Sequence, residues 1–135
     1  MKKIIEEMKL DVAIDAADVD TSDQTSAVFL DMANYDRVAV VAKSVALTAG
    51  KKLTVQLKQA TDAAGSAAKA LGAAVVGTAV SGALAPQVLA EVGADAMDAA
   101  NGFTFVGVTI GTDEGSSKAG CAVLVRGGAR QMPVS

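Results

Sequence analysis

The sequence predicts an all-β fold, a jelly-roll-like sandwich or barrel of about seven to eight short antiparallel strands with an N-terminal arm. Three observations support it: apolar and polar residues alternate in several short segments, β-branched residues fill others, and turn-forming residues separate them. The chain has 135 residues, the length of one domain. We therefore expect a single β domain, 1–135, with residues 1–7 as the arm.

The first alternation lies in residues 8–16. Every second residue there is apolar, and Lys9, Asp11 and Asp15 occupy alternate positions. A period of two predicts a half-buried strand with one apolar face toward the core. A polar, turn-forming segment follows, and a short strand is expected at 27–30.

A hairpin is expected in the middle of the chain. The segments 37–47 and 53–58 are both strand-like, and the second alternates most regularly. The apolar positions of the first segment shift phase halfway along, which predicts a bulge near 42–44. Residues 48–50 (Thr-Ala-Gly) form a turn signal, so we expect the two strands to pair directly.

The second half of the chain is expected to hold strands and loops. Residues 66–85 are rich in alanine, but recurrent glycine and valine favour strands over a helix. Short strands are predicted at 88–92, 103–110 and 119–126, and the dipeptide Asn-Gly at 101–102 marks a tight turn.

Residue types that carry catalytic chemistry are scarce. The chain has no histidine, the commonest general base and metal ligand. The single cysteine, Cys121, cannot form an intrachain disulfide, and its alternating apolar surroundings predict a small buried hydrophobe. Asp18, Asp20 and Asp23 lack the glycine and glutamate of a calcium loop and are expected to be solvated. We expect no enzyme activity, no cofactor and no metal.

Charge and aromatic content bear on the partners. The net charge is −3 and only 3% of residues are aromatic, which argues against nucleic acid as a partner. Glu6 and Glu7 interrupt any signal-peptide core. The uncharged stretch 70–90 has too few large apolar residues to enter a bilayer, so we also expect no membrane partner.

Four segments resemble a group of virion proteins. They are 28–38 (VFLDMANYDRV), 46–50 (ALTAG), 55–62 (VQLKQATD) and 127–134 (GGARQMPV). Together they resemble the capsid cement, or decoration, proteins of tailed bacteriophages. The resemblance implies a jelly-roll protein made in the host bacterial cytoplasm that binds the outside of the capsid. There it would bridge major capsid protein subunits and stabilise the shell.

Two other functions remain open. A head-completion or tail-end ring protein would occur in far fewer copies per particle than a cement protein. A surface or glycan-binding module would need exposed aromatic residues or an acidic pocket, and the sequence offers few of either.

The candidate partner-binding residues are those outside the predicted core. Edge strands and small apolar side chains favour self-association as a dimer or trimer, in addition to binding of the major capsid protein. Tyr35 is the expected main anchor, because it is amphipathic and large. The full set is Ile4, Ile5, Asp31, Asn34, Tyr35, Arg37, Arg126 and Arg130.

Overall fold

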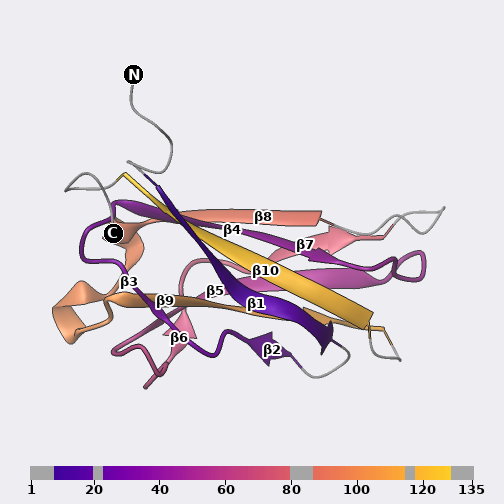
Figure 1. The fold of residues 1–135 in the computed structure, drawn as a ribbon, viewed down its shortest axis with the longest axis horizontal. Helices are drawn as coiled ribbons and strands as arrows, with labels where there is room; N and C mark the ends of the chain where they lie inside the picture. Colours follow the sequence, from indigo (N-terminus) through magenta and orange to yellow (C-terminus); the bar gives the residue numbers. More distant parts are fainter. Residues whose placement is uncertain (1–7, 20–22, 80–86, 115–117, 129–135) are drawn as a thin grey trace.

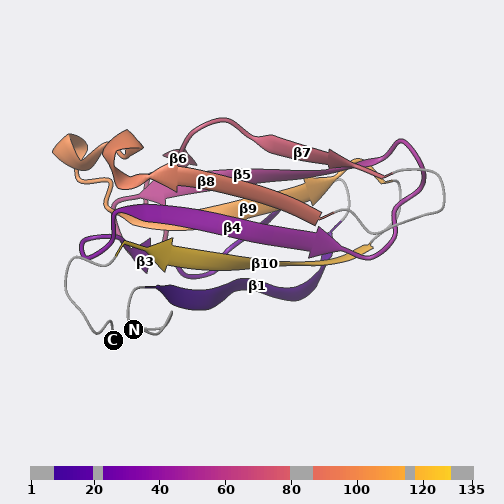
Figure 2. The ribbon, with the colours of Figure 1, turned by 90° about the horizontal axis from the view of Figure 1, so that it is seen from above.

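Two antiparallel β-sheets stack face to face in the computed structural model, which describes residues 8–19, 23–79, 87–114 and 118–128 (Figures 1 and 2). Sheet A has the order β1-β10-β4-β8, and in sheet B β9 and β5 form the centre. The strands of sheet A are β1 (Lys9–Val19), β10 (Lys118–Gly127), β4 (Arg37–Ser44) and β8 (Gln87–Gly93). Those of sheet B are β2 (Gln24–Thr25), β3 (Leu30–Asp31), β9 (Phe105–Thr112), β5 (Lys52–Ala60), β6 (Lys69–Ala70) and β7 (Val75–Thr78). Two short 3₁₀ turns, η1 (Ala94–Ala96) and η2 (Ala99–Asn101), connect β8 to β9.

The strand order is that of a jelly roll. β2 and β3 both pair with β9, and β6 and β7 both pair with β5, so each couple fills one strand position. The eight resulting positions then run 1-8-3-6 in sheet A and 2-7-4-5 in sheet B. The first and last positions pair in sheet A. Positions 2 and 7 pair in sheet B, positions 3 and 6 in sheet A, and positions 4 and 5 in sheet B, all antiparallel. This arrangement confirms the predicted all-β jelly-roll class.

Small aliphatic side chains fill the space between the sheets. Period-two alternation turns one side of each central strand inward, and these residues are at most 2% exposed. Sheet A contributes Val38, Val40, Ala42, Ala122 and Leu124, and sheet B contributes Leu53, Val55, Leu57, Val106, Val108 and Ile110.

The predicted hairpin is wrong. β4 pairs with β10 and β8 in sheet A, whereas β5 pairs with β9, β6 and β7 in sheet B. Residues 45–51 cross from one sheet to the other, and Lys51 N–H donates to the Thr48 carbonyl at 2.9 Å in the predicted turn. β4 pairs with β10 without a break as far as Ser44, so the predicted bulge is absent. The phase shift in the sequence marks the crossing, where Leu47 enters the core and Val45 stays exposed.

The first strand also differs from its prediction, because a β-bulge divides it. The register of β1 on β10 shifts between Val12 and Ile14. Ile14 is 6% exposed, whereas Leu10 and Val12 are 57% and 64% exposed. A one-residue shift turns the side chains to the opposite face. The apolar side of the strand is therefore split between the core and the outside of sheet A.

The remaining elements match more closely. β8, β9 and β10 lie at or within two residues of the strands predicted at 88–92, 103–110 and 119–126. The strand expected at 27–30 is instead β3, and the polar segment before it contributes β2.

Candidate interaction surface

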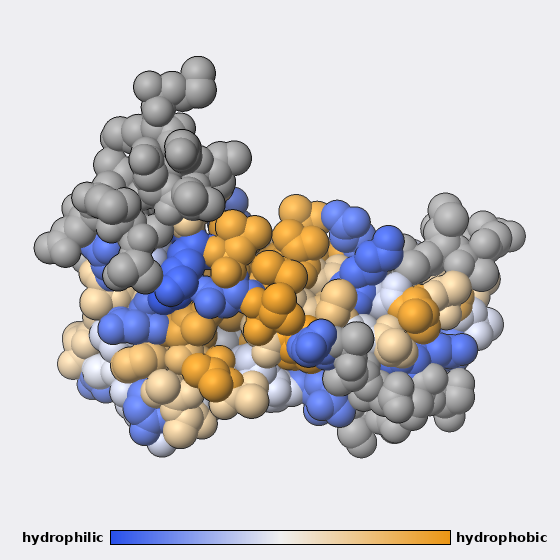
Figure 3. Space-filling view, viewed as in Figure 1, coloured by the Kyte–Doolittle hydropathy of each residue, from blue (hydrophilic) through white to orange (hydrophobic). Residues whose placement is uncertain are grey.

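The outer face of sheet A is apolar across all four strands (Figure 3). Val12 lies opposite Val123 of β10, which lies opposite Val41 of β4, which in turn lies opposite Leu89 of β8. The neighbouring row consists of Leu10, Val125, Ala39 and Glu91. It is therefore apolar on β1, β10 and β4 and charged on β8. We call this surface the sheet-A patch: Leu10, Val12, Ala39, Val41, Leu89, Val123 and Val125.

Charged residues flank the sheet-A patch on the same face. Lys43 lies in the row of Cys121 and Gln87 beyond Val41, and Glu91 lies at the far end of the row that begins with Leu10. Both charged residues are exposed. The patch thus has Lys43 on one flank and Glu91, with Arg37 3.6 Å from it, on the other.

The outer face of sheet B is different, because the chain covers part of it. Phe29 is 3% exposed and, with Ser26, lies over Gly107 of β9, whose neighbours Val106 and Val108 face the core. A Cβ atom at Gly107 would lie 2.7 Å from the Phe29 ring and 2.6 Å from the Ser26 hydroxyl. Glycine is therefore needed for this close approach. Only the outside of sheet A keeps an apolar surface that spans all the strands of its sheet in the described part of the chain.

Four of the predicted partner-binding residues meet at one end of the sandwich. Asp31, Asn34, Tyr35 and Arg126 line a hollow together with Lys9 and Ala33. Arg126 lies in the inward-facing row of β10 and is 7% exposed. Its Nη1 donates to the Asp31 carbonyl at 2.7 Å, and its Nη2 donates to Asp11 Oδ2 at 3.0 Å.

Tyr35 belongs to the core, contrary to the expectation that it lies outside it. The side chain is 4% exposed, and the Arg126 guanidinium stacks 4.7 Å from the centre of its ring. An aromatic face is a favourable neighbour for a guanidinium removed from water. Tyr35 and Arg126 therefore serve the fold at this end.

Arg37 and Cys121 lie elsewhere, on two strands of sheet A. Arg37 is exposed on β4, where Nη1 lies 3.6 Å from Glu91 Oε1. Cys121 is half-buried on the outer face of sheet A rather than fully buried. Ile4, Ile5 and Arg130, like the predicted arm 1–7, lie outside the described residues.

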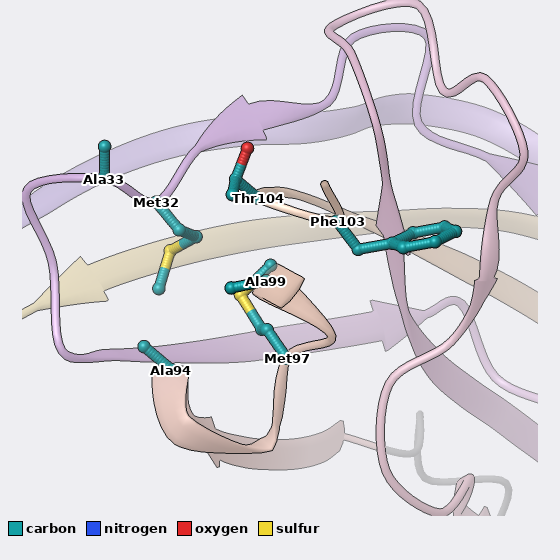
Figure 4. A pocket seen from close by; sticks show the side chains of 7 residues that line it. All are labelled: Met32, Ala33, Ala94, Met97, Ala99, Phe103 and Thr104. Atoms are coloured by element: carbon teal, nitrogen blue, oxygen red, sulfur yellow. The ribbon is translucent and has the colours of Figure 1, made fainter. Parts of the chain in front are cut away.

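A second hollow lies beside the first and was not predicted. Met32 and Met97 point into it from the 31–36 loop and from the residue after η1, and Ala33 lines both hollows (Figure 4). The full lining is Met32, Ala33, Ala94, Met97, Ala99, Phe103 and Thr104. We call the 31–36 loop together with η1 and η2 the loop end.

Hydrogen bonds hold the η2 side of the loop end. Lys69 Nζ lies 2.6 Å from Asp98 Oδ2, and Asn101 Nδ2 donates to the same carboxylate at 2.9 Å. The hydrogen bond from Lys69 is the main cause that lowers the pKa of Asp98. Lys69 also lies 4.0 Å from the centre of the Phe103 ring. The Asn-Gly dipeptide at 101–102 was the only sequence signal for this turn.

In the described ranges, no group of three acidic or cysteine side chains is arranged to hold a metal ion. No helix among the same residues is long and apolar enough to cross a membrane.

Known proteins share the fold without recognisable sequence similarity. No protein-family model matches the chain, and no curated protein sequence matches it. The VP2 subviral particle of infectious bursal disease virus aligns with 91% of this chain and 32% of its own, with a TM-score of 0.55 and 10% identity. The structure of the Gx strain of that virus aligns over 93% and 33%, with a TM-score of 0.53 and 12% identity. A protein of the disulfide-linked pili of Bacillus endospore appendages aligns over 92% and 90%, with a TM-score of 0.48 and 14% identity.

The chain thus has the jelly-roll fold seen in a viral particle protein. It spans about a third of the length of the viral chains that it matches.

Proposed function

We propose that the protein is a structural component of a virus particle, a cement protein of a tailed bacteriophage. It binds the outside of the capsid and bridges major capsid protein subunits. The fold shared with the VP2 particle supports a shell role, and the four sequence segments that resemble decoration proteins support the finer assignment.

The exposed sheet-A patch is the observation that carries this proposal. Leu10, Val12 and Leu89 are each more than half exposed and lie on one continuous face. Monomeric proteins rarely expose contiguous apolar patches larger than a few hundred Å² to water. An assembly protein has a use for such a face, since burial against a partner recovers its hydrophobic free energy.

The loop end is the proposed capsid contact. It combines an apolar hollow with exposed polar atoms of Asp31 and, beside it, the exposed Arg37. An aliphatic side chain of a capsid subunit would enter the hollow between Met32 and Met97, because methionine adapts to irregular apolar shapes. Individual contacts of this size are weak, but many identical ones on a shell add through multivalency.

The aromatic residues give a glycan-binding function little support. Phe29 and Tyr35 are buried, and Phe103 and Phe105 are half-buried, and these four are all the aromatic residues of the chain. A sugar face normally stacks on an exposed ring.

Shells prepared without the protein provide the test. Adding the wild-type chain is expected to raise the temperature at which the shells open, with hundreds of copies bound per particle. The variant Ala33→Glu places a charge between the two hollows and is expected to weaken retention at least about tenfold, or about 1.4 kcal/mol per contact. Ala49→Glu, at the exposed turn of the crossing, is the matched control and should bind like the wild type.

Three results would count against the proposal. Equal shell stability with and without the protein would exclude a cement role. A copy number equal to one ring would favour the head-completion or tail-end alternative. Unchanged retention of Ala33→Glu would show that the loop end is the wrong contact.

A further inference from the structure

The outer face of sheet A is large enough for a stable contact between two copies of the chain. Four strands about 4.8 Å apart and about eight residues long give a flat area of about 500 Å². Two such faces together reach the approximately 1,000 Å² of buried surface that a specific interface needs. Side chains that project from each face add further area. We propose that the sheet-A patch is a two-fold interface with a second copy of this chain, packed back to back.

The central row of the patch is complementary to itself. It runs straight across the sheet through Val12, Val123, Val41 and Leu89. A two-fold axis along this row, perpendicular to the strands, places each of these residues over its counterpart in the second copy. Every contact along the axis is then between two aliphatic side chains, as the isologous contacts of a two-fold dimer require.

The flanking charges select this axis. The rotation exchanges the row of Glu91 with the row of Lys43, so Glu91 of each copy comes to lie over Gln87 of the other, next to Lys43 on the neighbouring strand. Opposite charges then face each other at both edges of the interface. An axis parallel to the strands would instead place Glu91 over Leu10. Its carboxylate would then gain no cation from the facing copy beyond the Arg37 of its own chain at 3.6 Å, and burying it there is costly.

The resulting dimer suits a bridging role. The axis reverses the strand direction between the copies, so the two loop ends lie at opposite ends of the dimer. Two separated capsid contacts in one dimer are the minimum that bridging two capsid subunits needs. This consequence rests on the proposed function, whereas the dimer itself does not.

Sedimentation of the full-length chain over a range of concentrations tests the dimer without any shell. The wild type is expected to dimerise. Leu89→Asp introduces a charge on the axis in both copies and is expected to weaken the dimer at least about 100-fold, or about 2.8 kcal/mol. Val76→Asp is the matched control, because Val76 is a 50% exposed valine on β7 of the other sheet. This variant should dimerise like the wild type.

Charge reversal tests the axis. Lys43→Glu alone and Glu91→Lys alone are each expected to weaken the dimer, and the double variant should recover most of the loss. A wild-type chain that stays monomeric would overturn the proposal, as would a Leu89→Asp chain that still dimerises. Single reversals without effect, or a double variant no better than either single one, would exclude this axis. A monomer that still binds and stabilises shells would refute the dimer and leave the cement function standing.

Discussion

Arg126 occupies a position where a charged side chain is expensive. It follows Gly120, Ala122 and Leu124 in the inward row of β10, and its Nε has no hydrogen-bond partner in the structure. Asp11, the Asp31 carbonyl and the Tyr35 ring compensate for the lost hydration of the guanidinium. Such a pair adds little net stability, but removing one member leaves the other unpaired.

Arg126→Ala is therefore expected to lower the free energy of unfolding by about 2 to 3 kcal/mol. Urea unfolding followed by circular dichroism measures this. Arg37→Ala is the control, since Arg37 forms an exposed pair with Glu91 at 3.6 Å and should change stability by less than about 0.5 kcal/mol. Equal urea midpoints for the two variants would show that the Tyr35–Arg126 contact contributes nothing to the fold.

At the scale of the elements, two acidic residues that follow β9 hold the crossing between the sheets. Thr48 N–H donates to Glu114 Oε1 at 2.6 Å, and Lys52 N–H donates to Asp113 Oδ1 at 2.7 Å. These hydrogen bonds are the main cause that lowers the pKa of each carboxyl group. The crossing is thus held by acceptors whose hydrogen bonds are stronger in the ionised form.

Acid is expected to weaken this attachment. The pKa of Glu114 in the folded chain lies below its ordinary value of 4.5, so its stabilising effect is complete above that value and is lost as the pH falls through the folded pKa. Glu114→Gln should therefore show a smaller loss of stability than the wild type between about pH 5 and pH 3. Unfolding midpoints across this range measure the effect. An unchanged slope in Glu114→Gln would contradict the assignment.

At the scale of the whole molecule, the strand order ties the ends of the chain together. β1 pairs with β10, and the core draws on both sheets, so no part of the sandwich buries its apolar face alone. We expect one cooperative unfolding transition. Tyr35, the only tyrosine in a chain without tryptophan, reports on the core through its fluorescence. Its transition should coincide with that of the far-ultraviolet circular dichroism, and two separate midpoints would contradict a single domain.

Local patterns were sufficient for strand positions. In β5 the apolar and polar residues alternate from Leu53 to Lys58, and period two is set by backbone geometry alone. The turn at 48–50 was also predictable from its own residues, because Gly50 adopts a φ of 88° that glycine tolerates best. The fold class followed from the number and spacing of such segments.

The sequence by itself determined the all-β class, the inward residues of β5 and the absence of histidine chemistry. Only the tertiary structure decided that β4 and β5 lie in different sheets, that a bulge turns Leu10 and Val12 outward, and that Tyr35 is buried against Arg126. The physical reason is the distance along the chain over which each effect acts. Alternation and turn preference act over a few neighbouring residues, whereas strand partners and the side to which each apolar face turns depend on residues more than a hundred positions apart, such as Asp11 and Arg126.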